Sequence, residues 1–369
     1  MAGGLASYHL LLLRAALSIH GNDFGRFYYA TRTWLGGGSL YALNLATRIQ
    51  AERAAVDFLD MNPPHFHLLV LPLATLSLAR ADVFWVALNA LAGVVAGAMV
   101  TRELGLSFRI WHVLPVLCGV LLFAATGALS ATGQFTGLLL LPLTAAWRSA
   151  RHDRWGACGV WLGILVSVKP FLALFVPALL LMGRPRAVLL LALSLTACFA
   201  AGVLVFGWSA QIEWFTALRD VSWVWGRMNG SLLALFSRTL APNPDFAPLL
   251  IRPSLVTPLW LIGASVVSIV SMFVARRSVD HAFGVIILGS LLVSPLGWVY
   301  YLWLALPPCV ALWHNRVPRV SILGLVALTV PLVALLAYQP QPLATATIAS
   351  AYSWGTLALW LGVVTRGSS

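Results

Sequence analysis

The amino-acid sequence predicts an all-α polytopic membrane protein with about twelve transmembrane helices. Of its 369 residues, 60% are apolar and only 9% are charged, whereas soluble domains carry roughly a quarter charged residues. Apolar stretches alternate with short basic connectors, which is the pattern of membrane spans joined by cytoplasmic loops. We therefore expect residues 1–369 to form a single integral membrane domain.

The apolar stretches follow one another along nearly the whole chain. In order they lie near 5–19, 65–79, 82–101, 112–130, 134–147, 157–168, 171–182, 188–206, 256–275, 281–294, 299–313, 319–337 and 346–364. The first has the length of a signal peptide, but no small-residue cleavage site follows it, so we expect a retained span. The polar, aromatic insertion at 20–64 is the main exception to this pattern and the best indication of chemistry.

Topology decides which side of the membrane the insertion faces. Basic connectors are expected to be cytoplasmic. They are Arg148–Arg154, Arg184–Arg186, Arg276–Arg277 and Arg316–Arg319. If every apolar stretch crossed the membrane and the C-terminus were cytoplasmic, Asp23 would be cytoplasmic as well. We therefore expect one stretch, 65–79, to lie in the interface instead of spanning the bilayer.

Several features of 65–79 favour an interfacial helix. Prolines open the segment and Pro72 interrupts it. His65 and His67 are costly in hydrocarbon but tolerated at headgroup level. This solution leaves about twelve spans, both termini in the cytoplasm, and a location in the inner membrane. The two outer loops are then 20–81 and 207–255.

Three central stretches are too short to cross an undisturbed bilayer. About 13 residues at 1.5 Å each make roughly 20 Å, against a hydrocarbon core of about 30 Å. These stretches are 134–147, 157–168 and 171–182. Short helices are tolerated where they line a cavity or a thinned membrane. We expect the central third of the chain to form a recess open to the outer leaflet.

Charge and cysteine usage exclude other classes. The formal net charge is +12, but the basic residues lie in connectors and not on one soluble face, so we expect no nucleic-acid partner. The four cysteines all fall in apolar runs and form neither a disulfide framework nor a metal site. Asp57 and Asp60 come nearest to a metal-binding pair, and helix capping explains them better. We predict no metal and no cofactor.

Asp23 is the first candidate for chemistry. It stands where the first predicted span leaves the bilayer, with Tyr28 and Tyr29 close behind it. A carboxylate at this boundary can act as a general base; the structural alternative is a helix N-cap. The aromatic residues fit an interfacial belt, but aromatic faces also pack against sugar rings.

Two central polar residues are further candidates. Lys169, followed by Pro170, separates the two shortest helices and places an ammonium in the outer half of the membrane. A cation there is a candidate phosphate ligand, with a snorkelling lysine as the alternative. Gln134, after Gly133, either satisfies helix-end carbonyls or binds a ligand hydroxyl.

The second outer loop and the next outer turn supply the remaining candidates. Arg219, Arg227 and Asn229 lie close together with two tryptophans, a set that can hold an anion beside a polyol. Trp298 and Tyr300 belong to the turn that begins at Ser294 and either line the same cavity or mark the interface.

In this order, these residues resemble the GT-C superfamily of membrane glycosyltransferases. The closer resemblance is to glycosyltransferase family 87, the polyprenyl-phosphate-mannose-dependent α-(1→2)-mannosyltransferase-like group. The matching features run through most of the chain: Asp23, Tyr28-Tyr29, Tyr41, Asn62-Pro63-Pro64, Gly133-Gln134, Lys169-Pro170, Asn229-x-Ser231 and Ser294-Pro295-x-x-Trp298. One departure is Tyr300, near which relatives often carry histidine.

The resemblance implies an inverting glycosyltransferase in which Asp23 deprotonates the acceptor hydroxyl on the extracytoplasmic face. The donor would be a polyprenyl-phosphate sugar, by resemblance mannose, and the acceptor a glycan or glycolipid. A phosphate leaving group needs no general acid, but its charge needs stabilisation. We assign that role to Lys169 and Arg227, with Arg219 in reserve. His65 and His67 join Tyr28, Tyr29, Gln134, Asn229, Trp298 and Tyr300 as candidate substrate contacts.

A permease or flippase for lipid-linked saccharides is the alternative from a different class. In that case Lys169 and Gln134 would line a translocation path. Transporters often consist of two related halves, and the sequence contains no such halves. The long acidic first loop also suits catalysis better than a pore.

Overall fold

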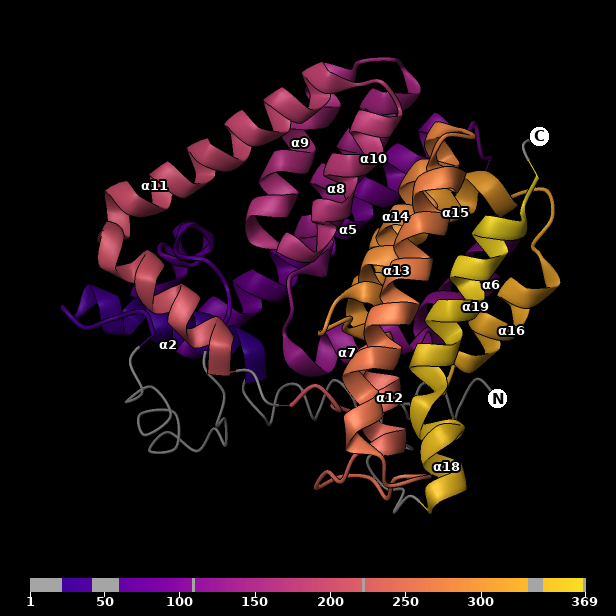
Figure 1. Cartoon of the computed structure of the whole chain (residues 1–369). Helices are drawn as coiled ribbons and strands as arrows, with labels where there is room; N and C mark the ends of the chain where they lie inside the picture. The colour runs from indigo at the N-terminus through magenta and orange to yellow at the C-terminus, as the bar shows by residue number, and fades with distance from the viewer. Residues whose placement is uncertain (1–21, 42–59, 108–109, 221–222, 331–340, 368–369) are drawn as a thin grey trace.

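The computed structural model describes residues 22–41, 60–107, 110–220, 223–330 and 341–367. In this part of the chain the regular elements are all helical (Figure 1), which confirms the predicted all-α class. The main helices are α2 (Asn22–Leu35), α5 (Leu78–Glu103), α6 (Ile110–Leu122), α7 (Ala124–Thr132), α8 (Thr136–Arg151), α9 (Trp155–Val168), α10 (Phe175–Leu181), α11 (Pro185–Ala217), α12 (Leu232–Leu240), α13 (Val256–Ala275), α14 (Val279–Val293), α15 (Leu306–Trp313), α16 (Arg319–Ala327) and α19 (Ala351–Thr365). Short turns between them are η1 (Pro64–Phe66), α4 (His67–Val70), η2 (Leu73–Thr75), η3 (Pro170–Leu174), η4 (Leu218–Asp220), η5 (Pro253–Leu255), η6 (Val299–Ala305), α18 (Pro342–Ala346) and η7 (Ile348–Ser350).

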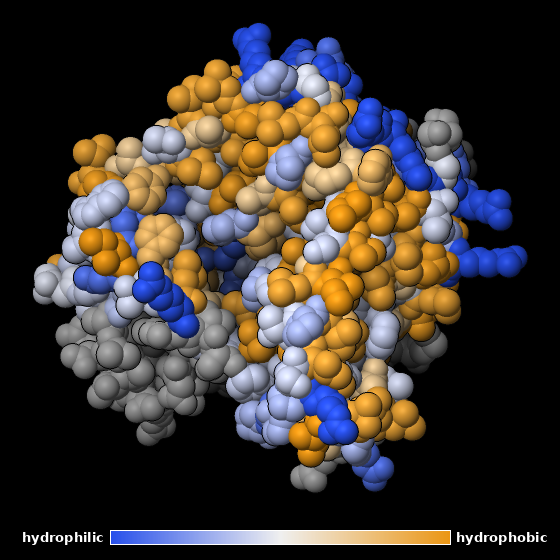
Figure 2. Space-filling model, in the orientation of Figure 1, coloured by the Kyte–Doolittle hydropathy of each residue, from blue (hydrophilic) through white to orange (hydrophobic). Residues whose placement is uncertain are grey.

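Several of these helices have membrane character. The segments long and apolar enough to cross a bilayer are Leu78–Glu103, Pro185–Ala217, Pro253–Ala275 and Pro342–Thr365. Shorter apolar helices are Trp155–Val168, Pro170–Leu181, Val279–Val293 and Val299–Trp313. Large apolar side chains on them are exposed and cover most of the face seen in Figure 2, which is typical of a lipid-facing surface. The predicted number of twelve spans stays a prediction, and the stretch 5–19 lies outside the described residues.

Charged connectors gather at one end of the helices, which we call the basic end. Glu103, at the end of α5, pairs with Arg148 at 3.0 Å and Arg151 at 3.2 Å, both from the last turn of α8. Arg151 also pairs with Asp280 in the first turn of α14, at 2.5 Å. Across the next helices, Arg277 donates to the Val364 carbonyl at 2.7 Å. The basic connectors that the sequence singled out therefore come together.

The opposite end of the same helices carries the predicted site, and we call it the site end. Gln134 precedes α8, Lys169 follows α9 and Ser294 follows α14. These helices have 16, 14 and 15 residues, so the two ends are separated by about 20–24 Å. As the sequence predicts, a break at Lys169–Pro170 separates two short helical segments.

Helix α11 changes direction at Gly207. The residue has φ 84° and ψ 167°, a conformation that glycine adopts without a steric penalty. The sequence places the start of an outer loop at 207; the chain instead continues as helix to Ala217 in a new direction (Figure 1). Trp214 in this second half donates to the Met61 carbonyl at 2.9 Å, so the kink brings α11 onto the segment before η1.

The segment 65–79 differs from the interfacial helix that we expect from the sequence. It consists of the short pieces η1, α4 and η2 followed by the start of α5. His65, Phe66 and His67 are buried inside the protein, whereas Leu69 is exposed, and the interfacial position of the segment stays a prediction. The two histidines can be buried because α2 and α9 supply hydrogen-bond partners, Thr31 and Ser167, which remove the need for water.

Glycine contacts hold helices α9 and α11 close together. A Cβ atom on Gly159 would lie 2.2 Å from the Ala187 carbonyl oxygen, and one on Gly163 would lie 2.4 Å from that of Leu191. Glycines four residues apart share one helix face and allow the backbones of α9 and α11 to approach. This contact fixes the position of Lys169, which follows α9 directly.

Candidate active site

Asp23 lies in the first turn of α2, with the residue 9% exposed. Its Oδ2 accepts a hydrogen bond from Gln134 Nε2 at 2.6 Å. Its Oδ1 lies 3.1 Å from Arg26 Nη1, one turn further along the helix. A carboxylate is favoured near a helix N-terminus, and here two donors from different elements also orient it. A helix cap would accept hydrogen bonds from backbone N–H groups, whereas the Asp23 carboxylate contacts the side chains of Gln134 and Arg26.

Gln134 is placed by the left-handed turn that ends α7. Gly133 has φ 67° and its carbonyl accepts from Trp85 Nε1 at 2.8 Å. The Gln134 amide nitrogen donates to Asp23 and not to a helix-end carbonyl, and its role in binding a ligand hydroxyl stays a prediction. Its Oε1 is buried and has no hydrogen-bond partner among the described residues. A buried acceptor left open in this way is available to a ligand hydroxyl or water.

Lys169 is held by neutral groups. Nζ donates to Asn62 Oδ1 at 2.9 Å, and it stands over the rings of Phe135 at 4.6 Å and Tyr301 at 5.2 Å. In the described part of the chain no carboxylate lies within 4.0 Å of this ammonium. It can therefore accept an anionic ligand without first breaking an ion pair.

Asp60 holds Asn62, the hydrogen-bond partner of Lys169, in place. Its Oδ1 accepts from both the backbone and side-chain nitrogens of Asn62, each at 2.8 Å. These two hydrogen bonds orient the Asn62 side chain so that its Oδ1 faces Lys169. Asp60 is 2% exposed and η1 begins only at Pro64, so it is not the helix cap that the sequence favours. Asp-x-Asn before two prolines is the local pattern that identifies it.

The two histidines belong to the same buried region. His67 Nδ1 contacts Thr31 Oγ1 at 2.8 Å and its Nε2 lies 3.3 Å from Asp60 Oδ2. His65 Nε2 contacts Ser167 Oγ at 3.1 Å, two residues before Lys169. Burial lowers the pKa of His65 to about 4 and also lowers the pKa of His67. His65 Nδ1 is buried and has no hydrogen-bond partner in the described chain.

Aromatic residues connect these groups. Phe135 follows Gln134 and packs against the Phe66 ring at 4.4 Å, and Lys169 Nζ also lies over the Phe135 ring. Tyr301 packs against Tyr300 at 4.6 Å, and the Asp23 carboxylate acts electrostatically on both. The Asp23 charge also acts on Lys169. Asp23, Gln134, Lys169 and the tyrosine pair therefore form one cluster at the site end.

Other predicted site residues have structural partners of their own. The Tyr28 hydroxyl donates to the Leu76 carbonyl at 2.7 Å, and Tyr29 packs edge-on against Tyr28 at 5.2 Å. Asn229 donates to the carbonyls of Val224 and Pro295, both at 2.8 Å. The Tyr28 hydroxyl and the Asn229 amide, which we predicted as substrate contacts, therefore donate to backbone carbonyls in this structure.

Asn229 and Trp298 join the second outer loop to the turn after α14. They form an isolated antiparallel bridge, and Asn229 Oδ1 accepts from the Gly297 nitrogen at 2.9 Å. The Trp298 ring stacks on Tyr300 at 6.3 Å. The bridge therefore connects the loop to the tyrosine pair of the cluster.

The arginines of the second outer loop, Arg219 and Arg227, form no hydrogen bond or ion pair with Asp23, Gln134 or Lys169 in the described part of the chain. Arg227 pairs with Asp245 at 3.5 Å and lies over Phe246, and Arg219 is exposed in η4. A third arginine that the sequence did not single out, Arg238, is fully buried. It donates to the Asn229 carbonyl at 3.0 Å and to Ser353 Oγ at 2.8 Å. Arg238 thus anchors the loop that carries Arg227.

A metal site is not formed by the described residues, among which no group of three or more His, Cys, Asp or Glu side chains could hold an ion. Among the described residues the site end instead offers the oriented carboxylate of Asp23, the ammonium of Lys169 without a paired acid, and open amide and imidazole groups, while the Asp60 carboxylate is occupied by Asn62 and His67. That set can deprotonate a hydroxyl and hold an anion.

Comparison with known proteins identifies the relatives of the chain. The family model described as glycosyltransferase family 87 matches residues 61–296, which is more than half of the chain. The matched range contains Asn62, Gln134 and Lys169, whereas Asp23 lies before it. A search of curated proteins and a search of solved structures returned no match.

Proposed function

The chain belongs to glycosyltransferase family 87, and from this premise we propose that it transfers a sugar from a polyprenyl-phosphate donor to an acceptor hydroxyl. Asp23 is the general base, and the sugar carbon is attacked with inversion. By resemblance the sugar is mannose and the acceptor is a glycan or glycolipid. The reaction takes place on the extracytoplasmic face of the inner membrane, with the basic end in the cytoplasm.

The observation that carries this proposal is the pair of donors on Asp23. Gln134 binds one carboxylate oxygen at 2.6 Å and Arg26 binds the other at 3.1 Å. A base is effective when its orientation is set before the substrate arrives. The open Oε1 of Gln134 supports a role in holding the same acceptor hydroxyl that Asp23 deprotonates.

The donor phosphate is assigned to Lys169. As the bond from the sugar carbon to the phosphate oxygen breaks, negative charge grows on the phosphate, and a fixed cation lowers the energy of that state. The departing polyprenyl phosphate is a much weaker base than the alkoxide that leaves in glycoside hydrolysis, so a second carboxylic acid, as used by glycosidases, is not required. Asp60 and Asn62 act as positioning residues for Lys169, since Asn62 accepts from its ammonium.

Arg227 and Arg219 stay candidates for the more distant phosphate oxygens. To bind the donor, Arg227 would exchange its ion pair with Asp245, which is long at 3.5 Å and partly exposed and therefore contributes little stability. The bridge between Asn229 and Trp298 links this loop to Tyr300.

The test is a transfer assay with purified protein in detergent and radiolabelled polyprenyl-phosphate sugars. We expect label to pass from mannosyl donor to an acceptor, and Asp23→Asn to lower the rate by about 10³-fold or more. The matched control is Asp280→Asn, which also changes a first-turn aspartate paired with an arginine, but at the basic end. It should retain activity within about twofold.

Two outcomes would overturn the proposal. Near-normal transfer by Asp23→Asn would reject the general base. Movement of intact lipid-linked sugar between leaflets, without transfer, would favour the permease or flippase alternative. The lipid-linked sugars that accumulate in cells lacking the protein would identify the donor sugar.

A further inference from the structure

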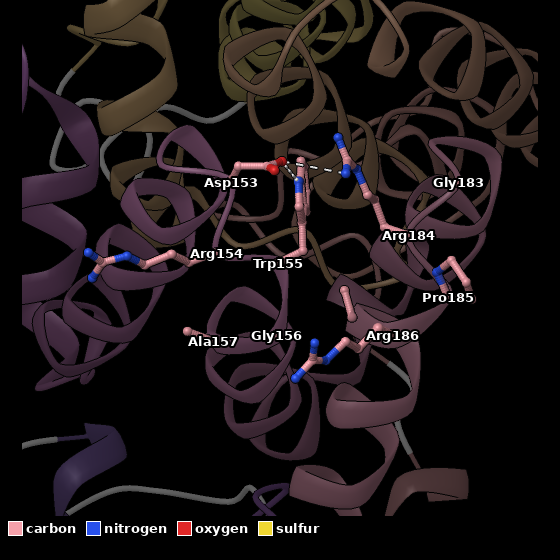
Figure 3. Close-up of a pocket in the computed structure, with 10 residues that line it drawn as sticks. Asp153, Arg154, Trp155, Gly156, Ala157, Gly183, Arg184, Pro185 and Arg186 are labelled. Atoms are coloured by element: carbon pink, nitrogen blue, oxygen red, sulfur yellow. Dashed lines mark hydrogen bonds and ion pairs between the residues drawn. The ribbon is translucent and has the colours of Figure 1, made fainter.

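A cavity of about 510 Å³ lies at the basic end, far from Asp23. The turn between α8 and α9 forms one wall and the turn between α10 and α11 forms the other (Figure 3). Helix α9 separates this cavity from Lys169, with 14 residues or about 21 Å between them. The cavity is therefore distinct from the candidate active site.

Positive charge at the cavity exceeds negative charge. The lining contains Arg154, Arg184 and Arg186 but a single acid, Asp153. Asp153 pairs with Arg184 at 3.5 Å and accepts from Trp155 Nε1 at 2.5 Å. Arg184 Nε is nevertheless buried and has no hydrogen-bond partner in the described chain.

Two of these guanidinium groups have no partner among the described residues. The side chains of Arg154 and Arg186 form no hydrogen bond or ion pair there, although the Arg154 backbone N–H donates to the Ser149 carbonyl at 2.7 Å. Figure 3 shows that Arg184 points toward Asp153, whereas Arg154 and Arg186 extend away from it. These two side chains are free to turn toward an incoming anion.

The helix backbones add to this charge. Both α9 and α11 begin at the cavity, at Trp155 and Pro185. The first N–H groups of a helix lack partners within the helix, and the helix dipole makes this end attractive to anions. Two helix N-termini and three arginines thus act on the same space.

Apolar side chains continue from the cavity along the same helices. Trp155 forms part of its wall, with the Arg184 guanidinium over its ring at 4.4 Å. The large exposed apolar residues nearest in the chain are Val160, Trp161, Leu180, Leu181, Leu189 and Leu193. A phosphate site that continues into a lipid-facing apolar surface fits an amphiphile better than a free ion.

We propose that this cavity binds the phosphate of an anionic phospholipid, whose acyl chains lie along α9, α10 and α11. Arg186 and Arg154 contact the phosphate, and Arg184 contributes its free Nε. The proposal is independent of the sugar-transfer proposal, because it concerns the opposite end of the helices.

The test measures lipid retained by protein in nanodiscs of phosphatidylcholine that contain a minor fraction of phosphatidylglycerol. Native mass spectrometry should detect bound phosphatidylglycerol on the wild-type protein. Arg184→Gln combined with Arg186→Gln should reduce that fraction at least fivefold. Arg102→Gln combined with Arg276→Gln removes the same charge from exposed positions at the same end and should change it less than twofold.

Each alternative result is decisive. Equal loss of phosphatidylglycerol in both double variants would show general charge attraction and overturn the site. Retention of inorganic phosphate by the detergent-solubilised protein, without selective lipid binding, would show a free-anion site and also overturn the proposal. A third variant, Arg186→Lys, keeps the charge and should lose less lipid than Arg186→Gln if the fold is intact.

Discussion

The two ends of helices α8, α9 and α14 use the same residue types in different ways. Each end has an aspartate in the first turn of a helix that pairs with an arginine: Asp23 with Arg26, and Asp280 with Arg151. At the basic end, cations outnumber acids and much of the surplus charge is exposed. At the site end, the described polar groups that lack a partner are buried and mostly neutral, such as Gln134 Oε1 and His65 Nδ1.

Glu103 and Lys169 make the difference concrete. The Glu103 carboxylate contacts Arg148, Arg151 and His152. Among the described residues, the polar and ring contacts of the Lys169 ammonium are one amide and two aromatic rings. Saturated ion pairs fix a fold and a topology, whereas an ammonium with no acid partner is suited to an anionic ligand.

The largest effect that would sharpen this comparison is expected from Lys169→Met. We expect kcat/KM for the donor to fall by about 10²–10³-fold, because one preorganised donor to a developing charge is removed. Lys169→Arg should recover part of it. The measurement is transfer rate against donor concentration, with Arg148→Met at the basic end as control. A change confined to the acceptor KM would contradict the phosphate role.

The second effect concerns the packing that holds the two ends apart. Gly159→Val places side-chain atoms where the Ala187 carbonyl oxygen now lies, 2.2 Å from the Cβ position. We expect a loss of about 2–3 kcal/mol of stability, because α9 and α11 must separate. Thermal unfolding in detergent measures it. Gly97→Val is the control, since nothing lies within 4 Å of the Cβ position there. Equal stability of both variants would contradict the close contact.

The third effect is an acid sensitivity that belongs to the site end. Burial depresses the pKa of His65 to about 4, so folding favours the neutral ring. Its stabilising contribution is complete above about pH 6.5 and is lost as the pH falls toward 4, with a loss of about 2 kcal/mol by pH 5. His65→Gln should flatten the unfolding temperature between pH 6.5 and 4. His152→Gln, in an exposed position at the basic end, serves as control. An unchanged profile for His65→Gln would contradict this assignment.

The smallest effect is expected from Gln134→Leu. Loss of the hydrogen bond to Asp23 should lower kcat about tenfold while leaving the donor KM nearly unchanged, because the base is misoriented but the phosphate site is intact. Steady-state kinetics with both substrates separate the two parameters. A rise in donor KM with constant kcat would place Gln134 in donor binding instead.

Much of the architecture was predictable because lipid imposes simple rules. The all-helical class, the membrane character, the family and the break at Lys169–Pro170 are confirmed. Each follows from hydropathy, from proline chemistry or from a short ordered motif. The assignments of Asp23, Lys169 and the other site residues stay predictions.

Other features could not be derived from local pattern. The local pattern predicts a helix cap at Asp60 and headgroup contacts for His65 and His67. It does not reveal that His67 contacts Thr31, 36 residues away, or that His65 contacts Ser167, 102 residues away. Arg238 reads as one more basic residue, although it is fully buried and binds the loop before it.

By itself the sequence determined the helical membrane class, which connectors are basic, and which family the chain belongs to, since these depend on neighbouring residues. Only the tertiary structure decided that Gln134 binds Asp23 and that Asn62 binds Lys169. Those contacts join segments 111 and 107 residues apart. Their geometry depends on how glycine faces let helices approach, and no local pattern in the chain encodes that distance.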